Sequence, residues 1–193
     1  MAAMACDGTL VRIAALFALA VGLGYGLYAM LPLFLIAERG MDRPSANALV
    51  GLSRMFALPM VFAAGWLADR LGHLRALLAF QAVTGVLTVG LALAPTGFLT
   101  ALAVVLQAAA SVCFFPPYYA LVTQFVAPSR RHLAVSVVSI AGMFIGGGLI
   151  PPLIGYLAEA WSFAGATLLL GAAAFASPGL LLLSSARTSS LRD

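Results

Sequence analysis

Arg54 is the charged residue that lies well inside a long apolar stretch of this sequence. On a helix it would lie about 16 Å before Gly65 and about 13 Å after Ser45. An ionised side chain at such depth is costly in an apolar environment, so it is a candidate functional residue. A guanidinium can bind a carboxylate or phosphate of a solute. It can also reach toward the outer interface or pair within a helix bundle, and these alternatives stay open here.

A cluster of charged residues interrupts the apolar sequence between Gly65 and Arg75. Gly65 and Gly72 favour tight helix ends and a close turn. The carboxylate of Asp69 would be stabilised near a helix N-terminus by roughly 0.3 to 1 kcal/mol. It could equally cap its own turn or pair with Arg70 or Arg75, and the two arginines could serve only to set the topology.

Polar side chains inside the apolar stretches are further candidates for contact with a solute. Tyr25 and Tyr28 are three residues apart, so they share one face of a helix. Each such residue could instead satisfy its neighbours in a bundle. The candidates are Tyr25, Tyr28, Gln81, Gln107, Tyr118, Tyr119 and Gln124.

Glycine and proline are concentrated in one later apolar stretch. Gly146 and Gly147 favour close helix packing, and Pro151 and Pro152 favour a break in the helix shortly afterwards. A functional hinge and static packing are both consistent with this pattern.

The composition decides which elements position these residues. The hydrophobic fraction is 63%, the charged fraction is 8%, and the mean hydropathy is +1.09. A soluble domain carries about a quarter of its residues as charged types, so lipid must be the solvent of this chain. Lipid-exposed backbone forms helices or closed barrels. Barrel strands are short and alternate in polarity, whereas these apolar runs are long and continuous, so the chain is predicted to be helical.

Six membrane-spanning helices in a single domain, residues 1–193, are predicted from the runs and the turn-forming residues between them. The link before the last helix is the least defined, because only Glu159 and Trp161 mark it. The first run could be a signal peptide cleaved after Ala20, but it continues to Ala37, which is too long for a signal. The predicted ranges are 11–37, 45–68, 74–94, 98–126, 133–158 and 162–184.

The distribution of arginines predicts the orientation, because cytoplasmic loops carry an excess of basic residues. One side holds Arg12, Arg70, Arg75, Arg130, Arg131, Arg187 and Arg192, and the other holds Arg39 and Arg43. We therefore expect an integral protein of the bacterial cytoplasmic (plasma) membrane, with both termini in the cytoplasm.

An internal similarity suggests two inverted repeats, at about 11–94 and 98–184. Residues 65–69 and 155–159 each read glycine, aromatic, leucine, alanine, acid, and they end the second and fifth predicted helices. Three helices per repeat force opposite orientations, an arrangement typical of secondary transporters. Chance is the alternative, since alanine, leucine and glycine dominate the chain.

Segment 65–75 resembles the signature loop of the major facilitator superfamily, glycine-x-leucine-alanine-aspartate-arginine-x-glycine-x-x-basic. Segment 31–35, Pro59 and segment 115–155 are also similar to that family, so the resemblance covers nearly the whole chain. It implies an all-α bundle of six transmembrane helices. It also implies that Asp69, with its neighbours in the loop, docks against a helix N-terminus of an opposite half and holds one face of the transporter shut.

The resemblance extends to half of a transporter, since members of the family have about twelve helices in two halves. Gln107 stands where the N-terminal half usually carries an arginine, and the glycine–proline pattern of the fifth helix is similar to that of the eleventh. We therefore expect a C-terminal half. The chain would be a fragment, or it would work beside a second six-helix half, either a separate polypeptide or another copy of itself.

The function expected is secondary active transport of a small solute by alternating access, and Arg54 suggests an organic anion. The alternative is a non-transporting membrane partner or an inactive transporter fragment. The arginines are dispersed among loops, which does not favour nucleic acid. His73 and His132 lie at predicted loops without a catalytic set, so we expect no enzyme, no metal site and no cofactor. Cys6 and Cys113 are not expected to form a disulfide.

No carboxylate is predicted inside a membrane span, although proton-coupled carriers usually rely on an intramembrane acid. If the protein moves protons, the acid lies elsewhere or is one of the residues at the span ends. These are Glu38, Asp42, Asp69 and Glu159.

Overall fold

The computed structural model describes residues 8–124 and 128–189, and every regular element within those ranges is a helix. Two of the segments, η1 and η3, have π geometry, and η2 is a short 3-10 turn. The elements are α2 (Gly8–Val21), η1 (Gly22–Gly26), α3 (Leu27–Arg39), α4 (Arg43–Leu71), α5 (His73–Leu93), α6 (Phe98–Ser111), α7 (Phe115–Gln124), η2 (Pro128–Arg130), α8 (Arg131–Gly142), η3 (Met143–Leu149), α9 (Ile150–Ala160) and α10 (Phe163–Ser189).

These elements form six helical spans, which confirms the predicted all-α class of a six-helix bundle. The first span comprises α2, η1 and α3, the fourth α6 and α7, and the fifth α8, η3 and α9. The observed boundaries lie within five residues of their predictions, and the predicted end of the fourth helix, residue 126, lies outside the described residues. Within the described residues, five spans are long and apolar enough to cross a membrane, and the sixth has its apolar part at Phe163–Gly179. The inverted repeat stays a prediction.

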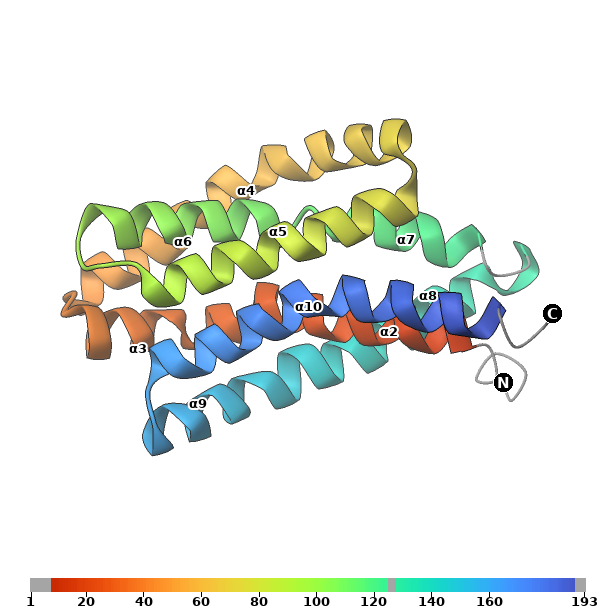
Figure 1. The fold of residues 1–193 in the computed structure, drawn as a ribbon. Helices are drawn as coiled ribbons and strands as arrows, with labels where there is room; N and C mark the ends of the chain where they lie inside the picture. The colour runs from red at the N-terminus through yellow and green to blue at the C-terminus, as the bar shows by residue number, and fades with distance from the viewer. Residues whose placement is uncertain (1–7, 125–127, 190–193) are drawn as a thin grey trace.

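The spans alternate in direction along the bundle (Figure 1). The start of α2, the end of α10, the turn after α4, the end of α7 and the start of α8 lie at one end of the bundle, and the turns after α3, α5 and α9 lie at the other. This alternation agrees with the predicted topology, while the cytoplasmic assignment stays a prediction. Cys6 lies outside the described residues.

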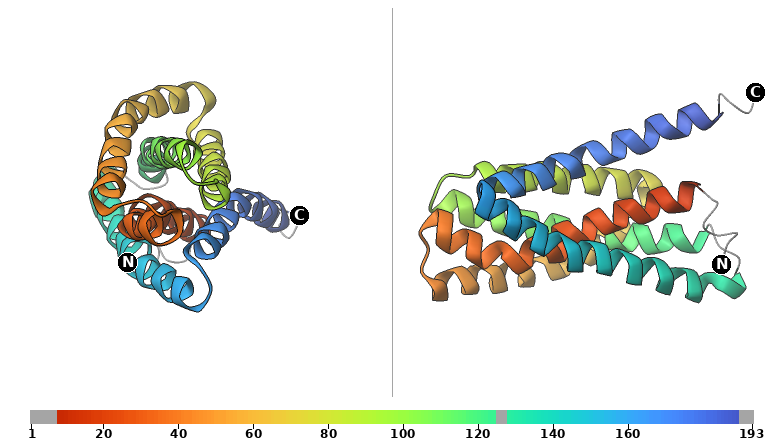
Figure 2. Two further views of the ribbon diagram at one scale, coloured as in Figure 1. Left: turned by 90° about the vertical axis from the view of Figure 1, so that its left-hand side faces the viewer. Right: turned by 90° about the horizontal axis from the view of Figure 1, so that it is seen from below.

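The first span lies inside the bundle, whereas α4 and the fifth span lie at its periphery (Figure 2). In the most apolar stretch of each span, 61% of the residues are buried in the first span, 17% in α4 and 12% in the fifth. The core follows from this arrangement. One buried cluster surrounds Phe17 and Tyr118, and a second surrounds Leu31, Leu91 and Val104.

Glycines allow two pairs of spans to approach closely. A Cβ atom on Gly26 would lie 2.6 Å from the carbonyl oxygen of Gly146, so η1 and η3 pack backbone against backbone. A Cβ atom on Gly85 would lie 2.5 Å from the nitrogen of Phe175, which brings α5 and α10 equally close. Small residues at such crossings provide the van der Waals contact that drives helix association in lipid.

Two adjacent side chains at the end of α3 connect three spans. Glu38 accepts hydrogen bonds from the backbone N–H groups of Phe163 and, at 2.9 Å, Ala164 at the start of α10. Arg39 donates to the carbonyl oxygen of Ala92 at the end of α5, at 2.8 Å. An anion at a helix N-terminus and a cation at a helix C-terminus both complement the helix dipole, so the pair stabilises this end of the bundle.

The second span begins at a side-chain cap. Asp42 accepts a hydrogen bond from the backbone nitrogen of Ser45 at 3.1 Å, and hydrogen bonding lowers the pKa of the Asp42 carboxyl below its usual value. A lowered pKa means that the cap stabilises the folded state above the ordinary aspartate pKa. That stabilisation is lost as the pH falls through the lower value of the folded state.

Candidate functional site

Arg54 is half-buried near the middle of α4 and contacts the first span. Its Nη2 atom donates a hydrogen bond to the carbonyl oxygen of Gly24. The carbon of its guanidinium lies 3.5 Å from the ring centroid of Tyr28 and 5.8 Å from that of Tyr25. The structure therefore brings three of the predicted site residues together around one cation, and aromatic faces attract such a cation.

The ring of Tyr28 is held from two other spans. Its hydroxyl lies 3.1 Å from Oγ of Ser53 on α4 and 3.4 Å from the carbonyl oxygen of Val104 on α6. Tyr28 is 6% exposed, whereas Tyr25 is 51% exposed. The buried tyrosine therefore presents a fixed face to Arg54, and the exposed tyrosine borders the same guanidinium on the open surface of the bundle.

The carbonyl that accepts from Arg54 belongs to the π segment η1. Such segments are rare and occur frequently at functional sites, because they interrupt the regular i to i−4 hydrogen bonding. Gly26 of the same segment packs on Gly146 of η3. The two π segments therefore lie against each other, with Arg54 contacting the first.

The predicted hinge candidates lie in and just after η3. Gly146 is buried in that segment and Gly147 is half-buried, while Pro151 and Pro152 occupy the first turn of α9. The fifth span thus departs from α geometry in the predicted region. Movement at this point is not tested by the structure, so the hinge stays a prediction.

Gln81, Gln107 and Tyr118 are buried inside the bundle, with exposed fractions of 0%, 0% and 1%. Gln107 donates from Nε2 to the carbonyl oxygen of Leu23 and to Oγ1 of Thr88, both at 3.3 Å. Within the described residues, the amide of Gln81 and the hydroxyl of Tyr118 have no hydrogen-bond partner. None of the three side chains opens onto a surface in this conformation, so a role in solute contact stays a prediction.

The other two candidates lie farther along the fourth span. Tyr119 is half-buried and its ring centroid lies 5.3 Å from that of Tyr118, with the planes at 71°. Gln124 is exposed at the end of α7. The structure does not place either of them beside Arg54.

The two glycines of the charged loop, Gly65 and Gly72, each predict a helix end or a close turn, and the structure has one at Gly72 only. Gly72 has a φ of 87° and joins α4 directly to α5, a conformation that glycine adopts without strain. Gly65 does not end the helix: it lies inside α4, within the predicted range 45–68, and α4 continues to Leu71. A Cβ atom on Gly65 would lie 3.8 Å from Pro116, an ordinary van der Waals distance, so the packing there does not require a glycine.

Asp69, near the end of α4, and Arg75, near the start of α5, are both exposed. The guanidinium carbon of Arg70 lies 4.0 Å from the ring centroid of Trp66. In the described part of the chain, Asp69 forms no ion pair with Arg70 or Arg75. Its carboxylate is therefore accessible for contact with another bundle, and its role in a gate stays a prediction.

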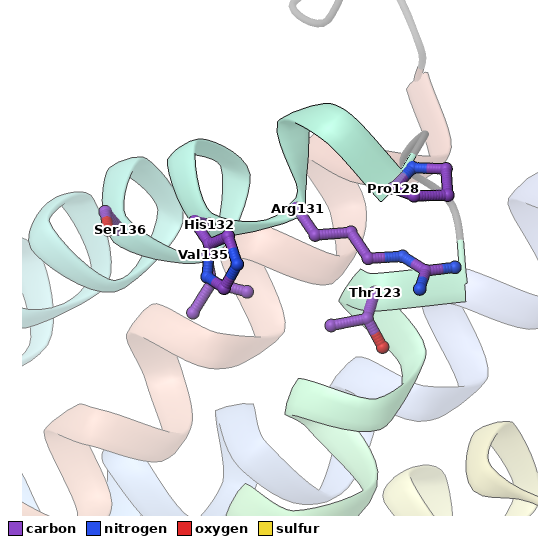
Figure 3. Close-up of a pocket in the computed structure, with 6 residues that line it drawn as sticks. All are labelled: Thr123, Pro128, Arg131, His132, Val135 and Ser136. Atoms are coloured by element: carbon purple, nitrogen blue, oxygen red, sulfur yellow. The ribbon is translucent and has the colours of Figure 1, made fainter.

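A pocket of about 460 Å³ lies between α7 and α8 at the same end of the bundle. Figure 3 shows the side chain of Arg131 extending between Pro128 and Thr123, with His132 on the next position of α8. This pocket lies apart from Arg54, and the sequence did not predict it. Its lining residues are Thr123, Pro128, Arg131, His132, Val135 and Ser136.

Sequence reasoning missed the partners that position the site. Ser53 is adjacent to Arg54, but its hydroxyl contacts the hydroxyl of Tyr28, and nothing in the sequence indicated that pairing. Gly22, Gly24 and Gly26 indicated that this helix could bend, but not that the carbonyl of Gly24 would accept a hydrogen bond from Arg54. The sequence placed Glu38 and Arg39 only at the end of a span. It did not indicate that Glu38 would bond to the start of α10 and Arg39 to the end of α5.

Comparison with known proteins gives one family and a consistent fold. A model of the Major Facilitator Superfamily matches residues 13–192. A crystal structure of a peptide transporter, POT, in complex with sulfate superimposes with a TM-score of 0.80 at 20% identity, covering 91% of this chain and 37% of that one. The fucose:proton symporter of E. coli superimposes with a TM-score of 0.78 at 20% identity, covering 93% and 43%. The chain thus spans about two fifths of these structures, and no curated protein matches its sequence.

Proposed function

The chain belongs to the Major Facilitator Superfamily and is an integral membrane protein, and from this premise we propose that it forms half of a secondary transporter for a small solute. In such carriers the solute site lies near the midplane, between two bundles that rock against each other. The finer features of that proposal are the solute class, the partner and the gate.

The solute class that we propose is an organic anion, and Arg54 carries this proposal. The residue lies deep in a span, half-buried, with its guanidinium stacked on Tyr28 and beside the exposed ring of Tyr25. A planar guanidinium binds a carboxylate or phosphate through two parallel hydrogen bonds. The alternative, that Arg54 serves only to pair within the bundle, is supported by one contact, the hydrogen bond to the carbonyl oxygen of Gly24. That bond uses one of the five N–H donors of the guanidinium.

The partner that we propose is a second six-helix bundle, whether a separate N-terminal half or another copy of this chain. The low burial of α4 and of the fifth span supports this, because only 17% and 12% of the residues in their most apolar stretches are buried within this bundle. The exposed carboxylate of Asp69, at the end of α4, is then available to a helix N-terminus of that partner.

Uptake into proteoliposomes by the assembled transporter tests the solute class. We expect Arg54→Gln to lower uptake of small carboxylates about tenfold or more, since a charged hydrogen bond contributes about 1.5 to 3 kcal/mol. Arg43→Gln removes the same charge at the exposed start of α4 and should leave uptake unchanged. Unchanged carboxylate uptake by Arg54→Gln would remove the anion proposal. Absence of any uptake by a verified two-bundle assembly would favour a non-transporting partner protein.

A further inference from the structure

Arg54 connects α4 to a backbone carbonyl that an anion can replace. Its Nη2 atom donates a hydrogen bond to the neutral carbonyl oxygen of Gly24 in η1. Hydrogen bonds from a guanidinium to an ionised acceptor are roughly twice as strong as bonds between neutral groups, and a carboxylate can accept two of them at once. A carboxylate that reaches this guanidinium therefore competes favourably with Gly24.

The ring of Tyr28 allows the exchange without loss of the stacking contact. It lies 3.5 Å from the guanidinium carbon and is fixed at its hydroxyl end by Ser53 and Val104. A guanidinium can turn in its own plane over such a face. Tyr28 is thus a positioning residue, while Tyr25, 51% exposed, lies on the open side from which an anion can arrive.

We propose that an anionic group of the solute displaces the Gly24 carbonyl from Arg54, so that solute binding releases the contact between α4 and η1. This inference rests on the proposed anion site and adds a consequence for the first span. The displaced carbonyl lies in the π segment that packs on η3 through Gly26 and Gly146. Solute binding at α4 is thereby coupled to the crossing of the first and fifth spans.

The release predicts a change in the hydrogen bonding of η1 that can be measured without transport. Benzoate serves as the anionic probe and benzamide as its neutral control, on the full chain in lipid nanodiscs. Hydrogen–deuterium exchange is followed in the peptide that covers residues 22–27. Binding itself is followed by the ¹⁵N signal of the Arg54 guanidinium, which is assigned by its absence in Arg54→Leu.

In the unaltered protein we expect benzoate to shift the Arg54 signal and to raise exchange in residues 22–27 about fivefold, the equivalent of one lost hydrogen bond. Benzamide should do neither. Arg54→Leu should show the raised exchange without any probe and no further response to benzoate. Arg43→Leu, a matched loss of charge at the start of α4, should behave as the unaltered protein.

The outcomes separate this inference from the proposed function. A benzoate shift of the Arg54 signal with unchanged exchange in residues 22–27 would overturn the displacement of Gly24 and leave the anion site in place. No shift of the Arg54 signal would overturn both. An equal response to benzamide, or normal exchange in the folded Arg54→Leu protein, would overturn the inference by showing that η1 is held independently of Arg54.

Discussion

At the scale of single residues, the site is defined by how one cation is held. Arg54 has a π-face beneath it, a carbonyl at one edge and a half-exposed tyrosine nearby. The hydroxyl of Tyr28 contacts Ser53, which is on α4 beside Arg54, and Val104 on α6, which brings the fourth span into this arrangement. The depth of Arg54 in the membrane was readable from the sequence, whereas the direction of its side chain required the packing of three spans.

The exposed carboxylate of Asp69 gives a prediction at this scale. In a two-bundle assembly, Asp69→Asn removes the charge that would dock on a partner helix N-terminus, an interaction of roughly 0.3 to 1 kcal/mol. We expect the balance between the two faces to shift about two- to fivefold toward opening at the end that carries Asp69. The measurement is the labelling rate of cysteines introduced on each face.

Asp42→Asn is the matched control for that change, because Asp42 caps α4 locally at the other end of the bundle and asparagine preserves a cap. It should leave the labelling rates unaltered. Identical rates for Asp69→Asn and the unaltered protein would argue against the gate.

At the scale of elements, the bundle is held by backbone crossings at glycine and by polar contacts at helix ends. The π segments η1 and η3 meet at Gly26 and Gly146, and α5 meets α10 at Gly85. The sequence indicated that glycines 146 and 147 favour close packing. It could not identify their partner, because a glycine carries no side chain that reveals which surface it faces.

Gly146→Ala tests the crossing of the first and fifth spans. The added Cβ atom would overlap the carbonyl oxygen of Ala18, and overpacking of this kind costs about 1 to 3 kcal/mol. We expect a lower unfolding temperature in detergent. Gly148→Ala, two residues away with no atom within 4 Å of its Cβ position, should be neutral or slightly stabilising. Equal effects of the two changes would mean that this crossing is not closely packed.

Glu38→Gln tests the polar connection at the other end of the bundle. Loss of the charge at the N-terminus of α10 should cost about 0.3 to 1 kcal/mol and speed amide exchange at Phe163 and Ala164. The readout is hydrogen–deuterium exchange of the first turn of α10. Glu159→Gln, a change at an exposed acid of the same end, provides the control. Unchanged exchange at Phe163 would show that the charge of Glu38 does not hold this turn.

At the scale of the whole molecule, the bundle has an uneven distribution of internal contacts. The first span is largely buried, and α4 and the fifth span are largely exposed, with large apolar side chains such as Phe56 and Phe144 on their surfaces. Lipid can cover such surfaces, and so can a second bundle. The topology of six alternating spans followed from the sequence, while this asymmetry did not.

A photo-crosslinking residue placed at position 144 tests which occupant is present. If a second six-helix bundle covers the fifth span, we expect the residue introduced at position 144 to form protein adducts. Mass spectrometry then identifies the adduct as a second copy or a separate half. The same substitution at Val83, which is 51% exposed on α5, should give lipid adducts. Lipid adducts from both positions in native membranes would contradict the proposed partner.

The sequence by itself determined the solvent, the number of spans, their alternation and the family, because these depend on composition, run length and short motifs. It also singled out Arg54, since a charge in an apolar run is visible without coordinates. Only the tertiary structure decided that Arg54 bonds to Gly24, that Gln81 and Gln107 are enclosed, and that η1 packs on η3. Those properties depend on the relative rotation and local geometry of neighbouring helices. In a chain that is apolar on all sides, no periodic pattern records which face meets protein and which meets lipid.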